Sequence, residues 1–121
     1  GPARGRSGGL GLGHVGAMDV NAACTGFIYA LSIADKWIRV GDARRALVIG
    51  AECLSRVTDW NERTTCVLFG DGAGAAVLKR AEGERGIVSS HHGSDGHLGN
   101  LLYRPGGGAE FMLELPLENK A

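Results

Sequence analysis

With 121 residues, of which 44% are hydrophobic, the chain is long enough for one globular domain with a core of its own. Lys and Arg total 13 and Asp and Glu also total 13, so the formal net charge is zero and no overall field would attract nucleic acid or an anionic membrane. Because no apolar stretch reaches the roughly 18 residues of a membrane helix and the chain does not begin with the apolar segment of a secretory signal, we expect a cytoplasmic protein that binds neither nucleic acid nor a membrane.

Residues 1–13 are rich in glycine and show no apolar periodicity. The Gly-Pro start is typical of the remnant of a cleaved tag, so we interpret this stretch as a leader or tag-like flexible segment outside the fold. Order is expected to begin near Val15. Residues 17–21 are predicted to form a short strand, which leads through two alanines to Cys24.

Residues 27–40 have the spacing of an amphipathic helix. Apolar residues recur at every third or fourth position, which places them on one face. These are Phe27, Ala30, Leu31, Ala34 and Ile38. We predict a helix that is mostly buried, with Asp35 and Arg39 as an exposed pair one turn apart and Gly41 as its stop. Cys24 would then lie close to the start of this helix.

Four short apolar segments are predicted to be strands of a buried sheet. They cover residues 46–50, 66–69, 74–78 and 86–90. The first follows a helix directly, as in a βαβ unit, so we expect parallel pairing and an α/β fold. The sequence Gly-Asp-Gly at residues 70–72 is predicted to form a tight turn between the second and third strands, and residues 55–65 a polar loop.

Beyond Leu101 the apolar pattern weakens, and Pro105 is followed by three glycines. We therefore assign residues 14–105 to one part of a domain. Residues 106–121 are interpreted as a linker or as the start of a further part.

The three cysteines differ in their predicted surroundings. An odd number without CxxC or Cys/His spacing predicts reduced thiols, with neither a disulfide framework nor a metal site. Cys24 lies among small residues ahead of a helix, where unpaired N–H groups would favour a thiolate and stabilise an oxyanion. On this pattern alone, a nucleophile and a buried inert cysteine have equal support. Cys53 and Cys66 lie on or beside predicted buried strands and are expected to be inert.

Two motifs, taken together, resemble one known family. Residues 19–27 read Asp-Val-Asn-Ala-Ala-Cys-Thr-Gly-Phe, and residues 69–78 read Phe-Gly-Asp-Gly-Ala-Gly-Ala-Ala-Val-Leu. In sequence, order and spacing they are similar to the β-ketoacyl-acyl-carrier-protein synthase III family, and the similarity extends from about residue 10 to residue 105. The resemblance implies a thiolase-like layered αβαβα fold, of which this chain would be the nucleophile-bearing N-terminal half, incomplete.

The resemblance also implies an activity. In this family an acyl group passes from acyl-CoA to a cysteine and is then condensed with malonyl-acyl-carrier protein, which initiates fatty-acid synthesis. Carried over by position, Cys24 is the acylated residue and Arg63 holds the nucleotide end of coenzyme A. Three further residues would line the acyl and pantetheine channel: Leu54, Phe69 and Leu102. Arg63 could instead be a solvated loop arginine, and the three apolar residues could be plain core.

Acyl-CoA and acyl carrier protein are the partners that the resemblance implies, together with a second copy of the chain. Family members form homodimers across the strand before the cysteine, here residues 17–21, which would otherwise be an edge. No cofactor and no metal is expected beyond the substrates. The length of the acyl chain does not follow from the sequence.

The family's decarboxylation step uses a His and an Asn that stabilise the developing enolate. His91, His92 and His97 lie outside the family's motif for them, and Asn100 and Asn119 lack its context. His14 lies outside it as well. We therefore expect that the chain as given does not catalyse decarboxylative condensation. Two alternatives stay open: a non-catalytic fragment or scaffold of the fold, and a related acyltransferase or polyketide-type synthase.

Overall fold

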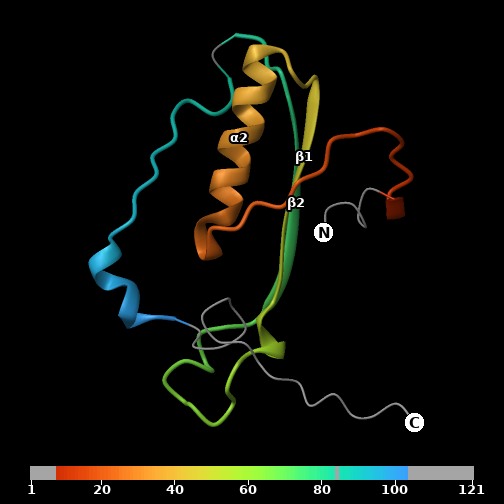
Figure 1. Ribbon diagram of the computed structural model, residues 1–121. Helices are drawn as coiled ribbons and strands as arrows, with labels where there is room; N and C mark the ends of the chain where they lie inside the picture. Colours follow the sequence, from red (N-terminus) through yellow and green to blue (C-terminus); the bar gives the residue numbers. More distant parts are fainter. Residues whose placement is uncertain (1–7, 84, 104–121) are drawn as a thin grey trace, which may run out of the picture. The chain divides into compact units, whose positions relative to one another are not determined.

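The structure is a computed structural model that describes residues 8–83 and 85–103. The chain divides into two units, Gly1–Ser90 and His91–Ala121, and each is described by itself. The first unit contains, in chain order, η1 (Ala23–Thr25), α2 (Gly26–Val40), β1 (Arg45–Cys53), η2 (Leu54–Arg56) and β2 (Asp71–Lys79) (Figure 1). The second contains η3 (Gly96–Leu101), where the Asp95 side chain accepts a hydrogen bond from the His97 N–H at 3.0 Å.

The predicted helix is confirmed as α2. It ends at Gly41, whose φ of 93° is the left-handed conformation that glycine adopts without strain, and the Gly41 N–H donates to the Trp37 carbonyl at 3.1 Å. Arg39 Nε donates to the Asp35 carboxylate at 2.8 Å, and this bond holds the pKa of Asp35 below its ordinary value. The expectation of a mostly buried helix is wrong for the described part of the chain, since only Ala34 and Ile38 of α2 are buried.

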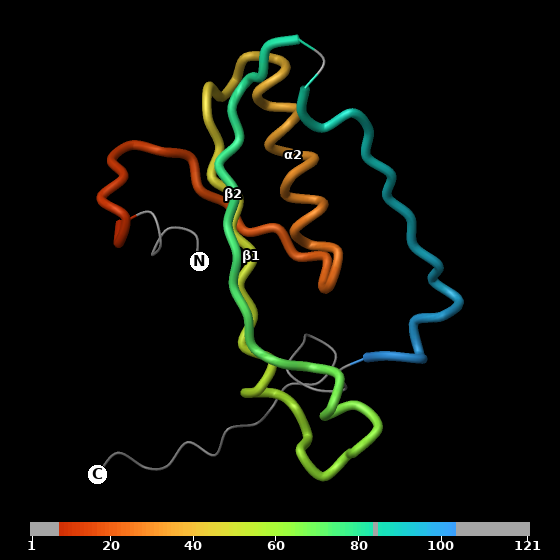
Figure 2. Tube along the Cα trace, turned by 180° about the vertical axis from the view of Figure 1, so that it is seen from behind, coloured from red at the N-terminus to blue at the C-terminus, as the bar shows by residue number. Residues whose placement is uncertain are grey.

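The strands β1 and β2 form a two-stranded antiparallel ribbon, in register from Arg45 opposite Lys79 to Cys53 opposite Asp71. They confirm and extend the strands predicted at 46–50 and 74–78. The parallel pairing expected for residues 46–50 belongs to a βαβ unit with the strand predicted at 17–21. That segment is not a strand in the structure, so the described residues form no parallel pair, and the pair that they do form is antiparallel. Figures 1 and 2 show α2 lying along one face of this ribbon.

Three other predicted strands, at residues 17–21, 66–69 and 86–90, are not strands in the structure. A strand needs a neighbour for its N–H and C=O groups, and the described residues offer these segments none. Residues 66–69 lie instead in turns, where the Cys66 N–H donates to the Glu62 carbonyl at 3.0 Å and the Leu68 N–H to the Thr65 carbonyl at 2.9 Å. The expected Gly-Asp-Gly turn is also wrong, because Asp71 and Gly72 are the first residues of β2.

The core of the first unit lies between α2 and the ribbon. Among the described residues, the buried apolar side chains are Ala34 and Ile38 of α2 and Val48 of β1. Because side chains alternate across a strand, the neighbouring Leu47 points to the opposite face, where it is 43% exposed and its cross-strand partner Val77 is 69% exposed.

The ends of α2 and β2 are joined by hydrogen bonds from arginines. Arg39 Nη2 donates to the Ile87 carbonyl at 2.7 Å, and Arg80 Nη2 donates to the Arg39 carbonyl at 3.0 Å. No helix in the described residues is long and apolar enough to cross a membrane. The boundary expected between residues 105 and 106, and most of the expected leader, lie outside the described residues.

Candidate functional site

Cys24 occupies the middle of η1, the short helical turn that runs directly into α2. Its thiol is free and exposed. The residue before it, Ala23, has a φ of 46°, the left-handed conformation that costs a non-glycine residue about 1–2 kcal/mol. The chain therefore makes a strained turn immediately before the cysteine and then enters the helix.

Local hydrogen bonds hold this turn. The Ala23 N–H donates to Asn21 Oδ1 at 3.3 Å, and Thr25 donates to the Ala22 carbonyl from its N–H at 3.1 Å and from its hydroxyl at 2.8 Å. The Cys24 N–H precedes the first helical bond, from Thr25 to Ala22, and so lies where a helix has donors without intrahelical acceptors. A thiolate, or an oxyanion formed on a group attached to the thiol, would be stabilised at this position.

The first turn of α2 rests on β1 through Phe27 and Gly50. A Cβ placed on Gly50 would lie 3.2 Å from Phe27 Cδ2, closer than most such contacts, so glycine leaves the room that the ring occupies. Gly50 lies three residues before the end of β1. The start of the cysteine-bearing helix is thereby fixed near the end of the ribbon from which residues 54–70 extend.

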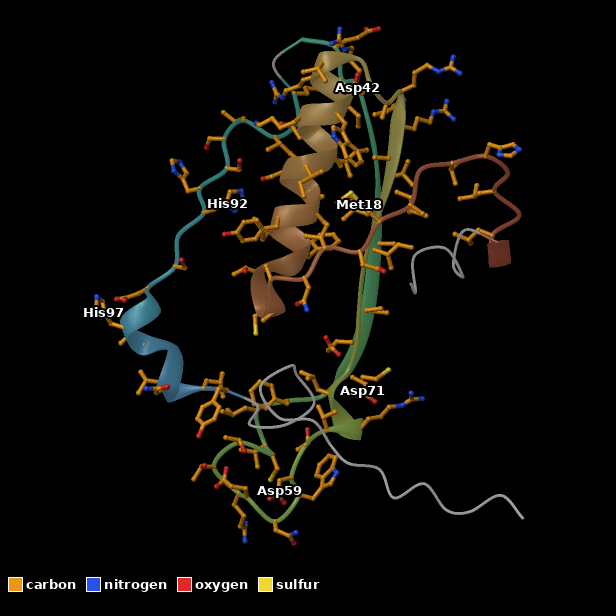
Figure 3. The ribbon with its side chains drawn as sticks, in the orientation of Figure 1. Met18, Asp42, Asp59, Asp71, His92 and His97 are labelled. Carbon is orange, nitrogen blue, oxygen red and sulfur yellow. The ribbon has the colours of Figure 1, made fainter. Side chains whose placement is uncertain are left out.

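Residues 54–70, here called the neck loop, leave β1 and return to β2. At its neck, the Asp71 carboxylate accepts two hydrogen bonds from Ser55, one from the N–H at 2.8 Å and one from the hydroxyl at 2.6 Å. The Ser55 hydroxyl and N–H, together with the nearby Arg56, hold the pKa of Asp71 below its ordinary value. Figure 3 shows Asp71 at this neck and Asp59 within the loop.

Further along the neck loop, Glu62 shapes a tight turn. Its carboxylate accepts hydrogen bonds from the hydroxyls of Thr64 and Thr65 at 2.6 Å and from their N–H groups at 3.0 Å. These bonds, the Thr64 hydroxyl first, lower the pKa of Glu62 from 4.5 to about 2. The Asp59 carboxylate makes a smaller turn by accepting from the Asn61 N–H at 2.9 Å.

The structure places three of the predicted binding residues in the neck loop. Arg63 is exposed in the Glu62 turn, Leu54 is half-buried in η2, and Phe69 is half-buried just before β2. Leu102 belongs to the second unit and is 62% exposed. Since the two units are described separately, the structure places Leu54, Arg63 and Phe69 in one loop but does not relate Leu102 to them.

The expectation of two inert cysteines on buried strands is wrong in its placement. Cys53 ends β1 and is exposed, and Cys66 is half-buried in a turn. As to metals, no group of three or more His, Cys, Asp or Glu side chains within residues 8–83 and 85–103 could hold a metal ion.

Sequence reasoning missed the hydrogen-bonded roles of Asp71 and Glu62. Asp71 was interpreted only as part of a turn, and residues 55–65 only as a polar loop. The signal for Glu62 was present, because an acidic side chain followed by Thr64 and Thr65 can accept from their N–H and hydroxyl groups and close a turn.

Comparisons with known proteins identify relatives of the chain. The family model of 3-oxoacyl-[acyl-carrier-protein (ACP)] synthase III matches residues 18–96. The chain is 62% identical over 98 residues to "Beta-ketoacyl-[acyl-carrier-protein] synthase III" of Xanthomonas euvesicatoria, covering 79% of this chain and 30% of the relative. It is 60% identical over 102 residues to the protein of the same name in Rhodospirillum centenum, covering 81% of this chain and 32% of that relative.

Solved structures give the same result. The structure resembles 3-oxoacyl-[acyl-carrier-protein] synthase III from Aquifex aeolicus with a TM-score of 0.66 and 55% sequence identity, covering 68% of this chain and 27% of the other. A synthase III from Thermus thermophilus matches with a TM-score of 0.64 and 46% identity, covering 67% and 25% of the two chains. The chain thus spans about a third or less of the length of these relatives.

Proposed function

The chain belongs to the 3-oxoacyl-[acyl-carrier-protein] synthase III family, and we propose that the whole protein, meaning this sequence with whatever precedes or follows it, is an acyltransferase that condenses an acyl group with malonyl-acyl-carrier protein. Its first unit is part of the thiolase-like fold of that family. The observation that carries the proposal is the exposed thiol of Cys24 at the strained turn that opens α2.

In the first half-reaction, the Cys24 thiolate attacks the thioester carbonyl carbon of acyl-CoA. A new carbon–sulfur bond forms while the carbonyl electrons move onto oxygen, and the oxyanion lies within reach of N–H groups at the helix start. When the carbonyl re-forms, the coenzyme A thiolate leaves with the electron pair of the broken bond and takes up a proton. The acyl group is then attached to Cys24 as a thioester.

Arg63 supports the assignment of acyl-CoA as the donor. The Glu62 carboxylate beside it is occupied by Thr64 and Thr65, and the described part of the chain gives the Arg63 guanidinium no acidic partner. A chain of zero net charge needs such a local cation to hold the phosphates or the adenine of a nucleotide. Leu54 and Phe69, in the same loop, are proposed to contact the pantetheine arm. Leu102, in the second unit, is proposed separately as a contact of the acyl or pantetheine chain.

The second half-reaction joins the acyl group to the carbanion formed when malonyl-acyl-carrier protein loses carbon dioxide. Acyl carrier protein is therefore the proposed second partner. We also propose a cytoplasmic homodimer formed through residues 17–21, which belong to no strand in the described chain. No cofactor beyond the two substrates is proposed.

Intact mass spectrometry after incubation with acetyl-CoA and longer acyl-CoA donors tests the proposal. We expect one acyl adduct, located on Cys24, that disappears in Cys24→Ala and persists in Cys53→Ala, the matched variant of another exposed cysteine. The mass of the adduct identifies the preferred acyl chain. A protein that acquires no adduct from any donor, or acquires it equally without Cys24, would contradict the proposal and favour a non-catalytic scaffold.

A second measurement examines the donor. Arg63→Ala should raise the apparent KM for acyl-CoA while leaving acylation by an N-acetylcysteamine thioester, which lacks the nucleotide, unchanged. Equal losses with both donors would mean that the substitution damages the fold rather than a nucleotide contact.

A further inference from the structure

Glu62 within the neck loop and Asp71 beside it each accept hydrogen bonds from residues of the loop. We propose that Glu62 and Asp71 are positioning residues for the coenzyme A donor: Glu62 fixes the turn that presents Arg63, and Asp71 closes the loop that carries this turn. The inference rests on the proposed function, because it assumes that Arg63 binds the nucleotide. Neither acid is proposed to touch the substrate.

Asp71 connects the two ends of the neck loop. It lies opposite Cys53 in the last pair of the ribbon, so its carboxylate is placed beside the first residues that leave β1. The 2.8 Å and 2.6 Å bonds from Ser55 join the exit of β1 to the entry of β2. The Thr58 hydroxyl adds a 2.7 Å bond to the Leu54 carbonyl on the same side of the neck. The ends of the loop are thus held independently of any ligand.

Glu62 determines the conformation around Arg63 itself. With hydrogen bonds from Thr64 and Thr65 on its carboxylate and one from the Cys66 N–H on its carbonyl, it encloses Arg63 in a closed turn. Because the carboxylate accepts hydrogen bonds from the threonines, it makes no direct ion pair with the adjacent guanidinium. The same residue therefore orders the arginine and leaves its charge available to a phosphate.

The direction of the change in acyl-CoA binding distinguishes a positioning role of Glu62 from a purely electrostatic one. Removing an acidic side chain next to Arg63 makes the loop more positive, which by Coulomb attraction alone would tighten binding of a polyanion. Loss of a fixed turn acts in the opposite direction, because the donor must then order the loop when it binds. Positioning predicts weaker binding of acyl-CoA, and charge predicts tighter binding.

The test measures the initial rate of Cys24 acylation by acetyl-CoA and by the acetyl thioester of N-acetylcysteamine, followed by intact mass in the whole protein. Glu62→Ala and Asp71→Ala should each raise the apparent KM for acetyl-CoA about tenfold, as expected when hydrogen bonds to a charged group are lost, with the maximal rate unchanged. Acylation by the short thioester should not change. Asp59→Asn is the matched control: it removes one negative charge from the same loop but keeps the oxygen that accepts from Asn61, and its KM should stay within about twofold of the parent.

A double-mutant cycle completes the test. If Glu62 acts through Arg63, adding Glu62→Ala to Arg63→Ala should produce little further rise in KM. A lower KM in Glu62→Ala, an unchanged KM in both single variants, or a full additional loss in the double variant would overturn the inference. So would an equal loss with the short thioester, which would indicate general damage. Failure of the proposed function is recognised separately, because Cys24 would then acquire no acyl group or Arg63→Ala would not distinguish the two donors.

Discussion

Replacing Gly50 by alanine tests whether β1 sets the position of the cysteine-bearing helix. An added Cβ would lie 3.2 Å from Phe27 Cδ2, so the ring must move by a few tenths of an ångström or the helix start must lift. Gly74, directly opposite Gly50 in the ribbon, provides the matched control, since a Cβ there meets no atom within 4 Å. The two substitutions have the same chemistry and differ in the neighbour that they meet.

The magnitude follows from two opposing terms. Glycine to alanine in a strand gains about 0.5–1 kcal/mol because the unfolded chain loses conformational freedom. Crowding a packed contact costs about 1–3 kcal/mol, and the low end applies because Phe27 is only half-buried and its ring can shift. We expect Gly74→Ala to be slightly stabilising and Gly50→Ala to be about 1–2 kcal/mol less stable than Gly74→Ala.

The assay is urea unfolding of the parent and both variants, with the slope of each transition compared to ensure that the same unfolding event is measured. Repeating Gly50→Ala in a Phe27→Ala background should remove most of its penalty, because the ring atom that it meets is then gone. If Gly50→Ala and Gly74→Ala are equally stable, the contact between Phe27 and β1 does not control packing, and the reasoning is refuted.

Three other outcomes follow from the site. Ala23→Gly should leave stability unchanged or raise it by up to about 1 kcal/mol, because the φ of 46° is no longer strained, whereas Ala23→Val should cost about 1–3 kcal/mol; urea titration of both variants checks this. The NMR signal of the Glu62 carboxyl carbon should titrate near pH 2, below the ordinary pKa of 4.5. The stabilisation of its turn is therefore fully present above pH 4.5 and is lost as the pH falls through about 2. Thr64→Val should raise the midpoint of this titration, and an unchanged midpoint would contradict the Thr64 hydrogen bond as the cause. Iodoacetamide should label Cys24 faster than the other two cysteines, because only Cys24 lies at the start of a long α-helix, whereas Cys53 precedes the single turn of η2; equal rates measured by peptide mapping would remove its distinction.

The elements that the sequence predicted correctly are those specified by local pattern. The apolar spacing of residues 27–40 and the glycine at position 41 are enough to define α2 and its end, and these are properties of neighbouring residues. The same holds for Cys24, which precedes α2 as expected. β1 and β2 were also found, because continuous apolar runs bounded by glycine or charged residues favour strands wherever a partner exists.

The secondary-structure predictions failed where the conformation of a segment depends on a second segment that pairs with it. Residues 17–21, 66–69 and 86–90 have apolar character, but extended backbone becomes a strand only when a neighbour accepts its hydrogen bonds, and a short segment contains no information about that neighbour. The parallel pair expected between residues 17–21 and 46–50 is absent from the described residues for the same reason, because residues 17–21 form no strand.

The same distinction between local patterns and distant partners determines which site residues could be predicted. Cys24 and Arg63 could be proposed as site residues because two motifs resemble those of a family in sequence and spacing. The hydrogen bonds between Asp71 and Ser55 could not be predicted, because these residues are 16 positions apart and no local sequence pattern indicates that the loop between them closes. Glu62 was the intermediate case, since all its partners lie within three residues and its role was in principle readable from the sequence.

One strand, β1, connects the turn that bears Cys24 with the neck loop. Its residue Gly50 contacts Phe27 from the first turn of α2, and its last residue, Cys53, lies opposite Asp71, which accepts hydrogen bonds from Ser55 at the neck. Three residues separate Gly50 from Cys53, which is about 10 Å of strand. Along a strand, that separation can change only in steps of one residue, and each step would also turn the following side chains to the other face. Backbone register therefore fixes the distance between these two attachment points, while the contact at Phe27 and the hydrogen bonds at Asp71 attach the helix start and the neck loop to them.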